Sequence, residues 1–216
     1  ISLQGPNSRK ILEKFIFTSP TQPSISELQW FRFSICRIED LNGIPLIISR
    51  TGYTGELGYE IWCSPSDAPK VWDKVSEAGK DDGLIPAGFG ALDLLRIEAG
   101  LILYGNEFDG QVDPFEAGVG FTVPLKTKTD DFLGKESLKK RKENPQKKLV
   151  GLELISKENA NHGDCVHIGR AQVGIVTSGC ISPVLNKNIA LCRIDIGHSN
   201  VGTEVEAVSY THLTLP

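Results

Sequence analysis

The segment 50–61 combines residue types that could bind a flat heterocycle. Three glycines at a spacing of three alternate with tyrosines and glutamates: Gly52, Gly55, Gly58, Tyr53, Tyr59, Glu56 and Glu60. Glycine permits positive φ angles and close approach to a ligand. A tyrosine ring can stack or hydrogen-bond, and one carboxylate can accept two parallel bonds from adjacent N–H groups. Glycine-rich hairpins with ordinary surface acids are common, so the motif alone remains a hypothesis.

Short strands are expected around this segment. The residues of 31–38 alternate, which places Phe31, Phe33, Ile35 and Arg37 on one face. Asn42-Gly43 then predicts a tight hairpin. Period-2 patterns and turn residues predict strands at 1–6, 44–49 and 59–63, with a Ser/Thr/Pro-rich loop at 18–29.

Helices are expected on both sides of the glycine-rich segment. Asn7 or Ser8 would cap a helix at 7–15, with Ile11, Leu12 and Phe15 on one face. Ser66 would cap a helix at 67–78 that stops at Gly79, with its inward face made of Val71, Trp72, Val75 and Ala78. On a further helix at 87–99, Leu92, Leu95 and Arg96 would share one side. Helices combined with antiparallel hairpins predict an α+β domain of split βαβ type.

The pattern changes near residue 147. Short strands separated by Gly, Asn and Pro turns are expected at 149–155, 171–176, 189–194 and 204–207, which is typical of a small all-β barrel or sandwich. Thr177-Ser178-Gly179 and Ser182-Pro183 are interpreted as turn residues with a backbone role. A helix at 135–143 would form a connector between the two parts.

Charge is distributed unevenly along the 216 residues. The net charge is −4, yet 126–148 holds nine Lys/Arg against four acids. We interpret this basic run as a solvated helix face; the alternative is a docking patch for an acidic partner or a polyglutamate tail. The acidic remainder argues against nucleic acid as a partner. No apolar run approaches the roughly 20 residues that span a bilayer.

Five cysteines at irregular spacing, without a Cys-x-x-Cys pair, predict reduced and mostly buried thiols in an intracellular protein. His162, Cys165 and His167 could supply three metal ligands, but a fourth is lacking, so no metal is expected. The tryptophans Trp30, Trp62 and Trp72 are interpreted as core or pocket wall.

The two ends suggest a fragment. The sequence contains no methionine, so we expect Ile1 to lie inside a longer protein. Residues 208–216 are typical of a translated cloning adapter, and we interpret them as a non-native tail.

Several of these motifs together resemble the aminomethyltransferase family, the glycine cleavage T-protein and its folate-dependent relatives. The resemblance rests on Arg50-Thr51-Gly52-Tyr53-Thr54-Gly55-Glu56 with Glu60-Ile61, on Leu3-Gln4-Gly5-Pro6, on the helix from Ala91 to Gly100, on Asp113–Gly118, on Asp131–Glu136 and on Val176–Gly179. It covers nearly the whole chain.

The resemblance implies a fold and a division into domains. It implies an α+β fold in which a ferredoxin-like split βαβ folate-binding domain precedes a small all-β barrel. Residues 1–125 would be the second half of the folate-binding domain, 126–146 a basic connector and 147–207 an incomplete barrel. The protein would lie in the cytoplasm of a bacterium or in a mitochondrial matrix.

The resemblance also implies an activity and a site. The activity is tetrahydrofolate-dependent transfer of an aminomethyl or methyl group from a small-molecule or lipoyl-carrier donor, with an acidic carrier protein as a possible partner. Glu60 would accept hydrogen bonds from the pterin, and Tyr53 would line the same cavity. The family's catalytic Asp would lie upstream of Ile1, so this chain alone is expected to be inactive.

One position departs from the family pattern. Leu92 stands where the family has a ligand-contacting Arg, and leucine cannot imitate a guanidinium. Arg96, one turn later, could compensate, although pairing with Asp93 or Glu98 is the simpler role. The change favours a divergent relative that acts on another N-methyl or S-methyl donor.

Three alternatives stay open. The chain could belong to a demethylase that uses a methylated glycine or sulfonium donor, or it could be the folate-binding part of a flavin-linked N-methylglycine oxidase. It could also be a non-catalytic folate-binding module. That last branch carries Lys-Gly-Cys-Tyr in its signature loop, where this chain has Arg50-Thr51-Gly52-Tyr53.

Overall fold

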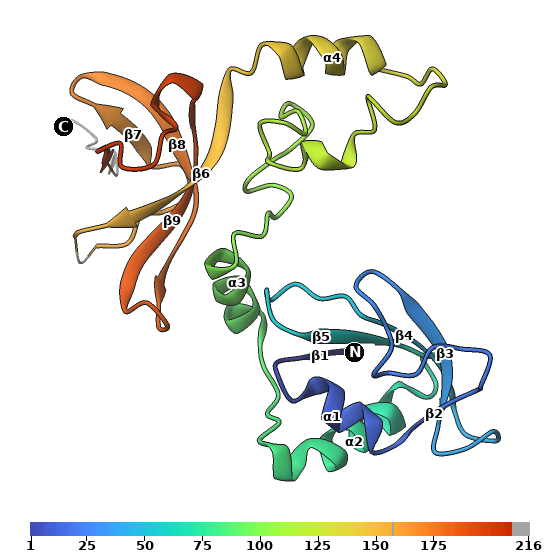
Figure 1. Ribbon diagram of the computed structural model, residues 1–216. Coiled ribbons are helices and arrows are strands. Elements are labelled where there is room, and N and C mark those ends of the chain that lie inside the picture. The colour runs from blue at the N-terminus through green and yellow to red at the C-terminus, as the bar shows by residue number, and fades with distance from the viewer. Residues whose placement is uncertain (157, 209–216) are drawn as a thin grey trace. The chain divides into compact units, whose positions relative to one another are not determined.

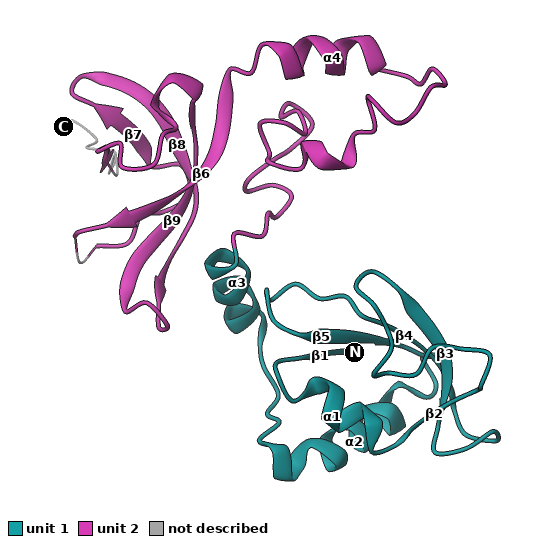
Figure 2. Ribbon diagram, viewed as in Figure 1, with its two compact units in different colours: residues 1–99 teal, residues 100–216 magenta. Residues whose placement is uncertain are grey.

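The computed structural model describes residues 1–156 and 158–208, and it divides into two compact units, 1–99 and 100–216 (Figure 2). Residues 209–216 of the predicted non-native tail lie outside the described residues, whereas Val208 ends a strand. Within the described residues, no helix is both long enough and apolar enough to cross a membrane.

The first unit is built on a five-stranded antiparallel sheet with strand order β1-β5-β4-β3-β2. Its strands are β1 (Ser2–Gln4), β2 (Ile16–Thr18), β3 (Phe33–Ile38), β4 (Pro45–Ser49) and β5 (Gly58–Trp62). Its helices are α1 (Ser8–Glu13), α2 (Ala68–Gly79), the short 3-10 turn η1 (Lys80–Asp82) and α3 (Phe89–Glu98). This mixed architecture confirms the predicted α+β class.

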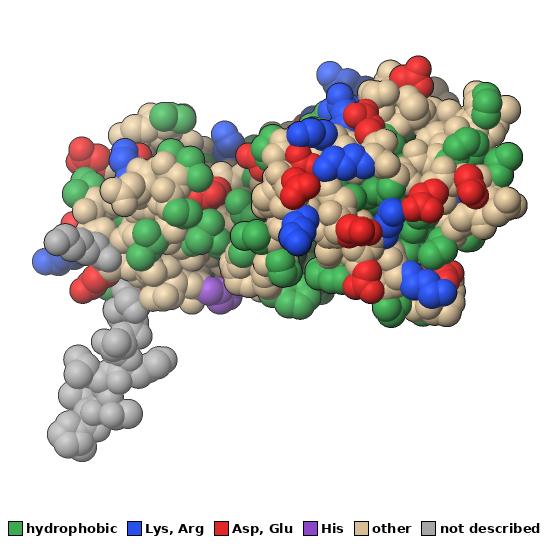
Figure 3. Space-filling view, turned by 90° about the horizontal axis from the view of Figure 1, so that it is seen from below, with side chains coloured by type: hydrophobic (Ala, Val, Ile, Leu, Met, Phe, Trp, Pro, Cys, Tyr) green, Lys and Arg blue, Asp and Glu red, His purple; other side chains and the backbone are tan. Residues whose placement is uncertain are grey.

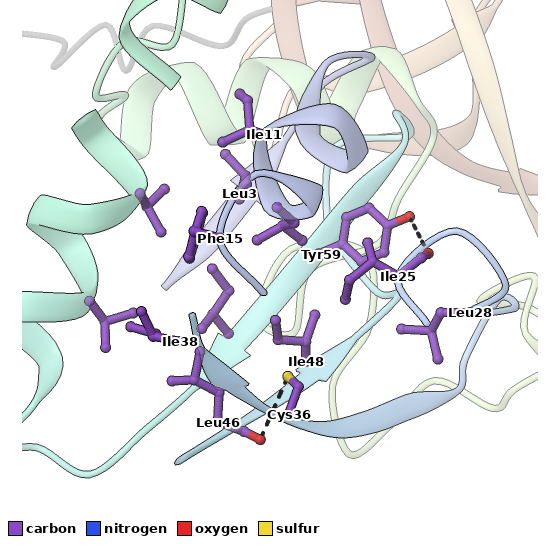
Figure 4. Close-up of a cluster of buried hydrophobic side chains, with 14 residues drawn as sticks. Leu3, Ile11, Phe15, Ile25, Leu28, Cys36, Ile38, Leu46, Ile48 and Tyr59 are labelled. Carbon is purple, nitrogen blue, oxygen red and sulfur yellow. Dashed lines mark hydrogen bonds between the residues drawn. The ribbon is translucent and has the colours of Figure 1, made fainter. Parts of the chain in front are cut away.

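The helices α1 and α2 cover one face of this sheet (Figure 1). Alternate residues of the central strands meet apolar residues of both helices there, because successive strand side chains point to opposite faces. Figure 4 shows this core, including a bond from the Cys36 thiol to the Leu46 carbonyl. The buried side chains include Leu3, Ile11, Leu12, Phe15, Cys36, Leu46, Ile48, Tyr59, Ile61, Val71 and Val75.

The opposite face of the sheet is open in this unit. Phe33 and Ile35 do share a face, as predicted, but it is the exposed one, and Ser34 and Cys36 point into the core. Ile47 and Trp62 are cross-strand partners on the same open face. The first unit therefore leaves an apolar surface beside its glycine-rich loop.

Two sequence expectations about the helices are corrected. The N-cap of α2 is Asp67 and not Ser66, whereas Gly79 is the last residue of the helix, as expected, and the chain continues into η1. Trp72 does not face inward but is about half exposed. Trp30 and Trp62 are more than half exposed as well, so none of the three tryptophans is a core residue.

The second unit contains the predicted all-β part, a five-stranded antiparallel sheet with order β10-β7-β8-β9-β6. Its strands are β6 (Lys147–Leu154), β7 (Cys165–Ile168), β8 (Ala171–Ser182), β9 (Lys187–Asp195) and β10 (Glu206–Val208). Its core gathers small and β-branched side chains: Ala160, Val166, Val173, Val176, Ala190, Cys192 and Ile194. Its helical segments are η2 (Gly120–Thr122), α4 (Lys135–Glu143) and η3 (Ile196–His198).

The turn predicted at Thr177-Ser178-Gly179 is wrong. These residues lie inside β8, where the pairing with β9 shifts register between Val176 and Ser178. Such a bulge inserts one extra residue and bends the strand. The polar, glycine-containing sequence therefore marks an irregularity within a strand, not its end.

Charged side chains of both signs lie on the surface. On the face shown in Figure 3, Lys and Arg side chains lie close to Asp and Glu side chains, with hydrophobic side chains between them. The basic helix α4 buries none of its residues, and Lys139 pairs with Glu136 on its own helix. These contacts are those of a solvated helix.

Candidate binding site on the open face of the first sheet

The glycine-rich loop between β4 and β5 is organised around Gln4 of β1. The Gln4 amide nitrogen Nε2 donates to the Thr51 carbonyl at 3.3 Å, and its oxygen Oε1 accepts from the Thr54 hydroxyl at 3.1 Å. One side chain from a distant strand thus holds both ends of the turn. Nothing in the local sequence pattern around Leu3-Gln4-Gly5-Pro6 indicates this role, because it arises from a contact between distant segments.

Gly52 and Gly58 leave space that the Gln4 amide occupies. A Cβ atom on Gly52 or Gly58 would lie 2.1 or 1.8 Å from Gln4 Oε1, closer than such atoms ever approach. Gly55 has a positive φ of 75°, and its Cβ would meet Ala99 at 2.5 Å. Of the three glycines, only Gly55 therefore uses the conformational freedom that the motif predicts.

Glu60 lies in β5, where it is the cross-strand partner of Ser49 in β4 and of Ser2 in β1. Its neighbours Tyr59 and Ile61 point into the core, so Glu60 points to the open face. The side chain is half-buried, and its Oε2 accepts a short hydrogen bond from the Thr51 hydroxyl. Glu60 is thus a carboxylate held against the sheet.

Apolar side chains lie next to this carboxylate on the same face. Trp62 is two residues further along β5, and it pairs with Ile47, which in turn pairs with Ile35 of β3. Phe33 pairs with Ser49, the partner of Glu60. A flat ring placed here would meet aromatic and aliphatic surfaces on one side and a carboxylate acceptor at its edge.

The other predicted site residues occupy different environments. Tyr53 is half-buried in the loop between β4 and β5. Arg96 lies in α3 with a side chain that is 0% exposed, and its Nε donates to Asp93 Oδ1 at 2.7 Å. The expected pairing with Asp93 is therefore present. Leu92 is half-buried on the same helix.

Tyr59, one of the side chains considered able to stack on a ligand, is not available for that role. It is 0% exposed, its hydroxyl accepts from Arg9 Nε at 3.2 Å, and it lies 3.5 Å from the Ile25 carbonyl (Figure 4). The strand register decides this, because Tyr59 and Glu60 point to opposite faces.

The second unit holds a buried acid of a different kind. Glu107 is 0% exposed; its Oε1 accepts from Thr177 Oγ1 at 2.9 Å and Ser178 Oγ at 2.6 Å, and its Oε2 accepts from the Leu103 amide at 2.8 Å. The residues at the irregularity in β8 thus satisfy one oxygen of this carboxylate, and the Leu103 backbone satisfies the other. Such saturation is typical of structural acids.

The possible metal ligands do not assemble into a site. His162 Nδ1 lies 2.7 Å from the Thr177 carbonyl oxygen, and a bulge separates Val166 from His167 in β7. Among residues 1–156 and 158–208, no group of three or more His, Cys, Asp or Glu side chains could hold a metal ion.

Comparison with known protein families shows which family models the two units match. Residues 1–127 match the family model described as the GCVT N-terminal domain, and residues 147–211 match that of the glycine cleavage T-protein C-terminal barrel domain. The α+β unit with its open sheet face and the all-β unit are thus both accounted for. The chain belongs to the glycine cleavage T-protein family.

Individual relatives carry two different names. A trimethylamine-oxide aldolase of Ruegeria pomeroyi is 59% identical over 95% of this chain and 26% of its own length. An aminomethyltransferase of Anoxybacillus flavithermus is 45% identical over 95% of this chain and 55% of its length. The crystal structure of the glycine cleavage system aminomethyltransferase T of Bartonella henselae superposes with a TM-score of 0.80, at 26% identity, over 97% of this chain and 55% of that one. The chain therefore spans about half of these aminomethyltransferases and about a quarter of the aldolase.

Proposed function

We propose that this chain binds tetrahydrofolate on the open face of its first sheet and serves one-carbon transfer in a longer protein. The observation that supports this most directly is the placement of Glu60. Its carboxylate is half-buried and held by Thr51, with Trp62 two residues along the same strand and Phe33 on the same face beyond Ser49. Family membership supplies the ligand class, and an acceptor carboxylate beside apolar side chains on this face suits a pterin.

The pterin ring carries an amino group and an adjacent ring N–H along one edge. In our proposal these donors pair with the Glu60 carboxylate, because parallel bonds to one charged acceptor are both strong and directional. The apolar side chains on the same face cover the ring. This fixes the plane of the ring and therefore the position of its reactive N5 nitrogen.

The transfer itself requires little covalent help. N5 attacks the aminomethyl carbon of a lipoyl-bound donor and ammonia leaves; N10 then displaces the carrier sulfur, which departs as a thiol, and methylene-tetrahydrofolate forms. Holding the two reactants in line supplies most of the acceleration in such reactions. By resemblance, an Asp that precedes Leu3–Pro6 in the family orients the folate nitrogen. We therefore assign binding to this chain and turnover to the longer protein.

A second candidate differs only in the donor. The relative named trimethylamine-oxide aldolase is 59% identical, against 45% for the aminomethyltransferase, and Leu92 replaces the family Arg. These observations favour an N-methylated amine or amine oxide as the source of the carbon. Supplying each donor to the longer protein and measuring either ammonia or a secondary amine separates the two candidates.

The binding proposal is tested by titrating tetrahydrofolate into the wild type and Glu60→Gln by calorimetry under anaerobic conditions. We expect the variant to bind roughly 10- to 100-fold more weakly, since an amide replaces a charged acceptor with one that also donates. Glu56→Gln is the matched control because Glu56 is exposed in the same loop. Equal affinity of the wild type and Glu60→Gln would remove Glu60 from the site.

A further inference from the structure

We propose that Thr51 is a positioning residue for Glu60, supported by Ser49 and Trp62 through a hydrogen-bond chain of fixed direction. This inference rests on the proposed function, because it concerns how the acid that meets the pterin is held. Thr51 acts only through the Glu60 carboxylate, so replacing Thr51 should weaken ligand binding because the carboxylate is no longer held.

The chain follows from the strand register. Ser49 and Glu60 are direct cross-strand partners in β4 and β5, and Thr51 follows Ser49 by two residues. The Thr51 hydroxyl donates to Glu60 Oε2, and the hydroxyl oxygens of Ser49 and Thr51 are 2.7 Å apart. The Trp62 indole nitrogen lies 3.5 Å from Ser49 Oγ. Four side chains from two strands and a loop thus form one line that ends on the acid.

The direction of every bond in this line is determined. A carboxylate only accepts, so the single hydroxyl hydrogen of Thr51 goes to Glu60. Thr51 must then accept from Ser49, whose own hydrogen is used in that bond. The indole N–H of Trp62 can only donate, so it donates to Ser49. The chain cannot reverse and carries no proton in either direction.

This fixed polarity leaves the acid ready for a ligand. Oε2 is occupied by Thr51, whereas Oε1 accepts no hydrogen bond from any residue that the structure describes. Donors in a chain polarise one another, which strengthens the last bond. A carboxylate that is already held in one orientation loses less conformational freedom when the ligand binds.

The members of the chain should differ in importance. The bond from Thr51 is the one made directly to the charged acid, so its removal has the largest effect. Ser49 is bonded to Thr51 and not to the acid itself, and the contact from Trp62 to Ser49 is at the long limit for a hydrogen bond. We expect Thr51→Val to weaken tetrahydrofolate binding about tenfold, Ser49→Ala about threefold and Trp62→Phe less than twofold.

The test measures tetrahydrofolate dissociation constants by calorimetry for the wild type, Thr51→Val, Thr51→Ser, Glu60→Gln and the double variant Thr51→Val/Glu60→Gln. Thr51→Ser keeps the donor and should bind like the wild type. In the Glu60→Gln background, Thr51→Val should cost little more, because the charged acceptor that Thr51 positions is already gone. Circular dichroism verifies folding; if Thr51→Val does not fold, Ser49→Ala must still show its threefold loss.

The outcomes separate this inference from the proposed function. If Glu60→Gln weakens binding but Thr51→Val does not, the positioning role is overturned and the folate site stands. If the two losses multiply in the double variant, Thr51 acts independently of Glu60 and the inference is again overturned. If the wild type does not bind, or binds no better than Glu60→Gln, the proposed function fails and this inference with it.

Discussion

Both units contain a five-stranded antiparallel sheet, but the glutamates Glu107 and Glu60 differ in burial and in the hydrogen bonds that their oxygens accept. In the second unit, Glu107 is fully buried and both of its oxygens accept hydrogen bonds from the protein. In the first unit, Glu60 is half-buried on an open face, and only Oε2 has a protein donor among the described residues. A buried carboxylate whose two oxygens both accept hydrogen bonds from the protein stabilises the fold. A carboxylate with one oxygen that accepts none from the protein can accept hydrogen bonds from a ligand.

Thiol labelling tests a property that the two units share. Each buries one cysteine in its core, Cys36 in the first unit and Cys192 in the second. Burial raises the pKa of Cys36 to about 12 and that of Cys192 to about 11. Because the thiolate is the reactive form, native Cys36 should react with iodoacetamide at pH 8 about a thousandfold more slowly than an ordinary thiol. Mass spectrometry of tryptic peptides measures the labelling.

Cys63, which is half-buried, serves as the internal control for this experiment. All five thiols should react once the chain is unfolded in denaturant. Labelling of native Cys36 as fast as Cys63 would show that the helix-covered face of the first sheet is not closed.

The two faces of the first sheet can be compared by one pair of neighbouring residues. Ile48 is 0% exposed in the core, whereas Ile47 is 44% exposed on the open face. Ile48→Ala should lower the free energy of unfolding by about 4 kcal/mol, from lost burial and the cavity left behind. Ile47→Ala should lower it by less than about 1 kcal/mol. Urea denaturation followed by tryptophan fluorescence measures both, because all three tryptophans lie in this unit.

The contrast between the two acids predicts opposite phenotypes. Glu107→Gln should destabilise the second unit by roughly 2–3 kcal/mol, because the new amide hydrogens face existing donors and a buried charged acceptor is lost. Glu60→Gln should change the free energy of unfolding by only about 0.5 kcal/mol. Far-UV circular dichroism follows both units, and tryptophan fluorescence follows the first alone. Equal destabilisation by the two changes would contradict the assignment of Glu60 to binding.

The smallest expected effect concerns an ion-pair cluster at the surface of the first unit. Lys10 donates to Asp82 at 2.6 Å and Lys14 donates to its other oxygen, and these hydrogen bonds lower the pKa of Asp82. A lowered folded-state pKa stabilises the fold above the ordinary value near 4, and this contribution is lost as the pH falls through the lowered value.

Asp82→Asn should therefore reduce Tm slightly at pH 7 and should not reduce it at pH values below the lowered pKa. The control is Asp81→Asn, which alters an exposed neighbour. Thermal melts at both pH values measure the difference, and added salt should shrink it. A deficit that persists unchanged in acid would exclude the ion pairs as its cause.

Local patterns were sufficient to predict most of the elements. The hairpin at Asn42-Gly43, the helix at 135–143 and the strands beginning near 147 and 189 follow from turn residues and periodicity. What the pattern could not give is which face of a strand is covered. Phe33 and Ile35 alternate as a core face would, yet the helices pack on the side of Ser34 and Cys36. That choice depends on tertiary packing.

The candidate site was only partly predictable for the same reason. Glu60 was chosen through the resemblance, and its position on the open face follows from strand register that no local signal encodes. Thr51, Ser49 and Gln4 were missed because their roles arise from contacts across strands. Tyr59 was wrongly considered for stacking, since a period-2 pattern does not say which of two neighbours points inward.

The contact between Gln4 and the glycine-rich loop limits how this protein can evolve. The amide of Gln4 occupies the volume that side chains at 52 and 58 would need, so β1 and the loop pack against each other through this side chain. A side chain at either loop position would displace the Gln4 amide and break the bonds by which Gln4 holds the loop. A smaller residue at position 4 would make room for such a side chain, although positions 52 and 58 lie 48 and 54 residues further along the sequence.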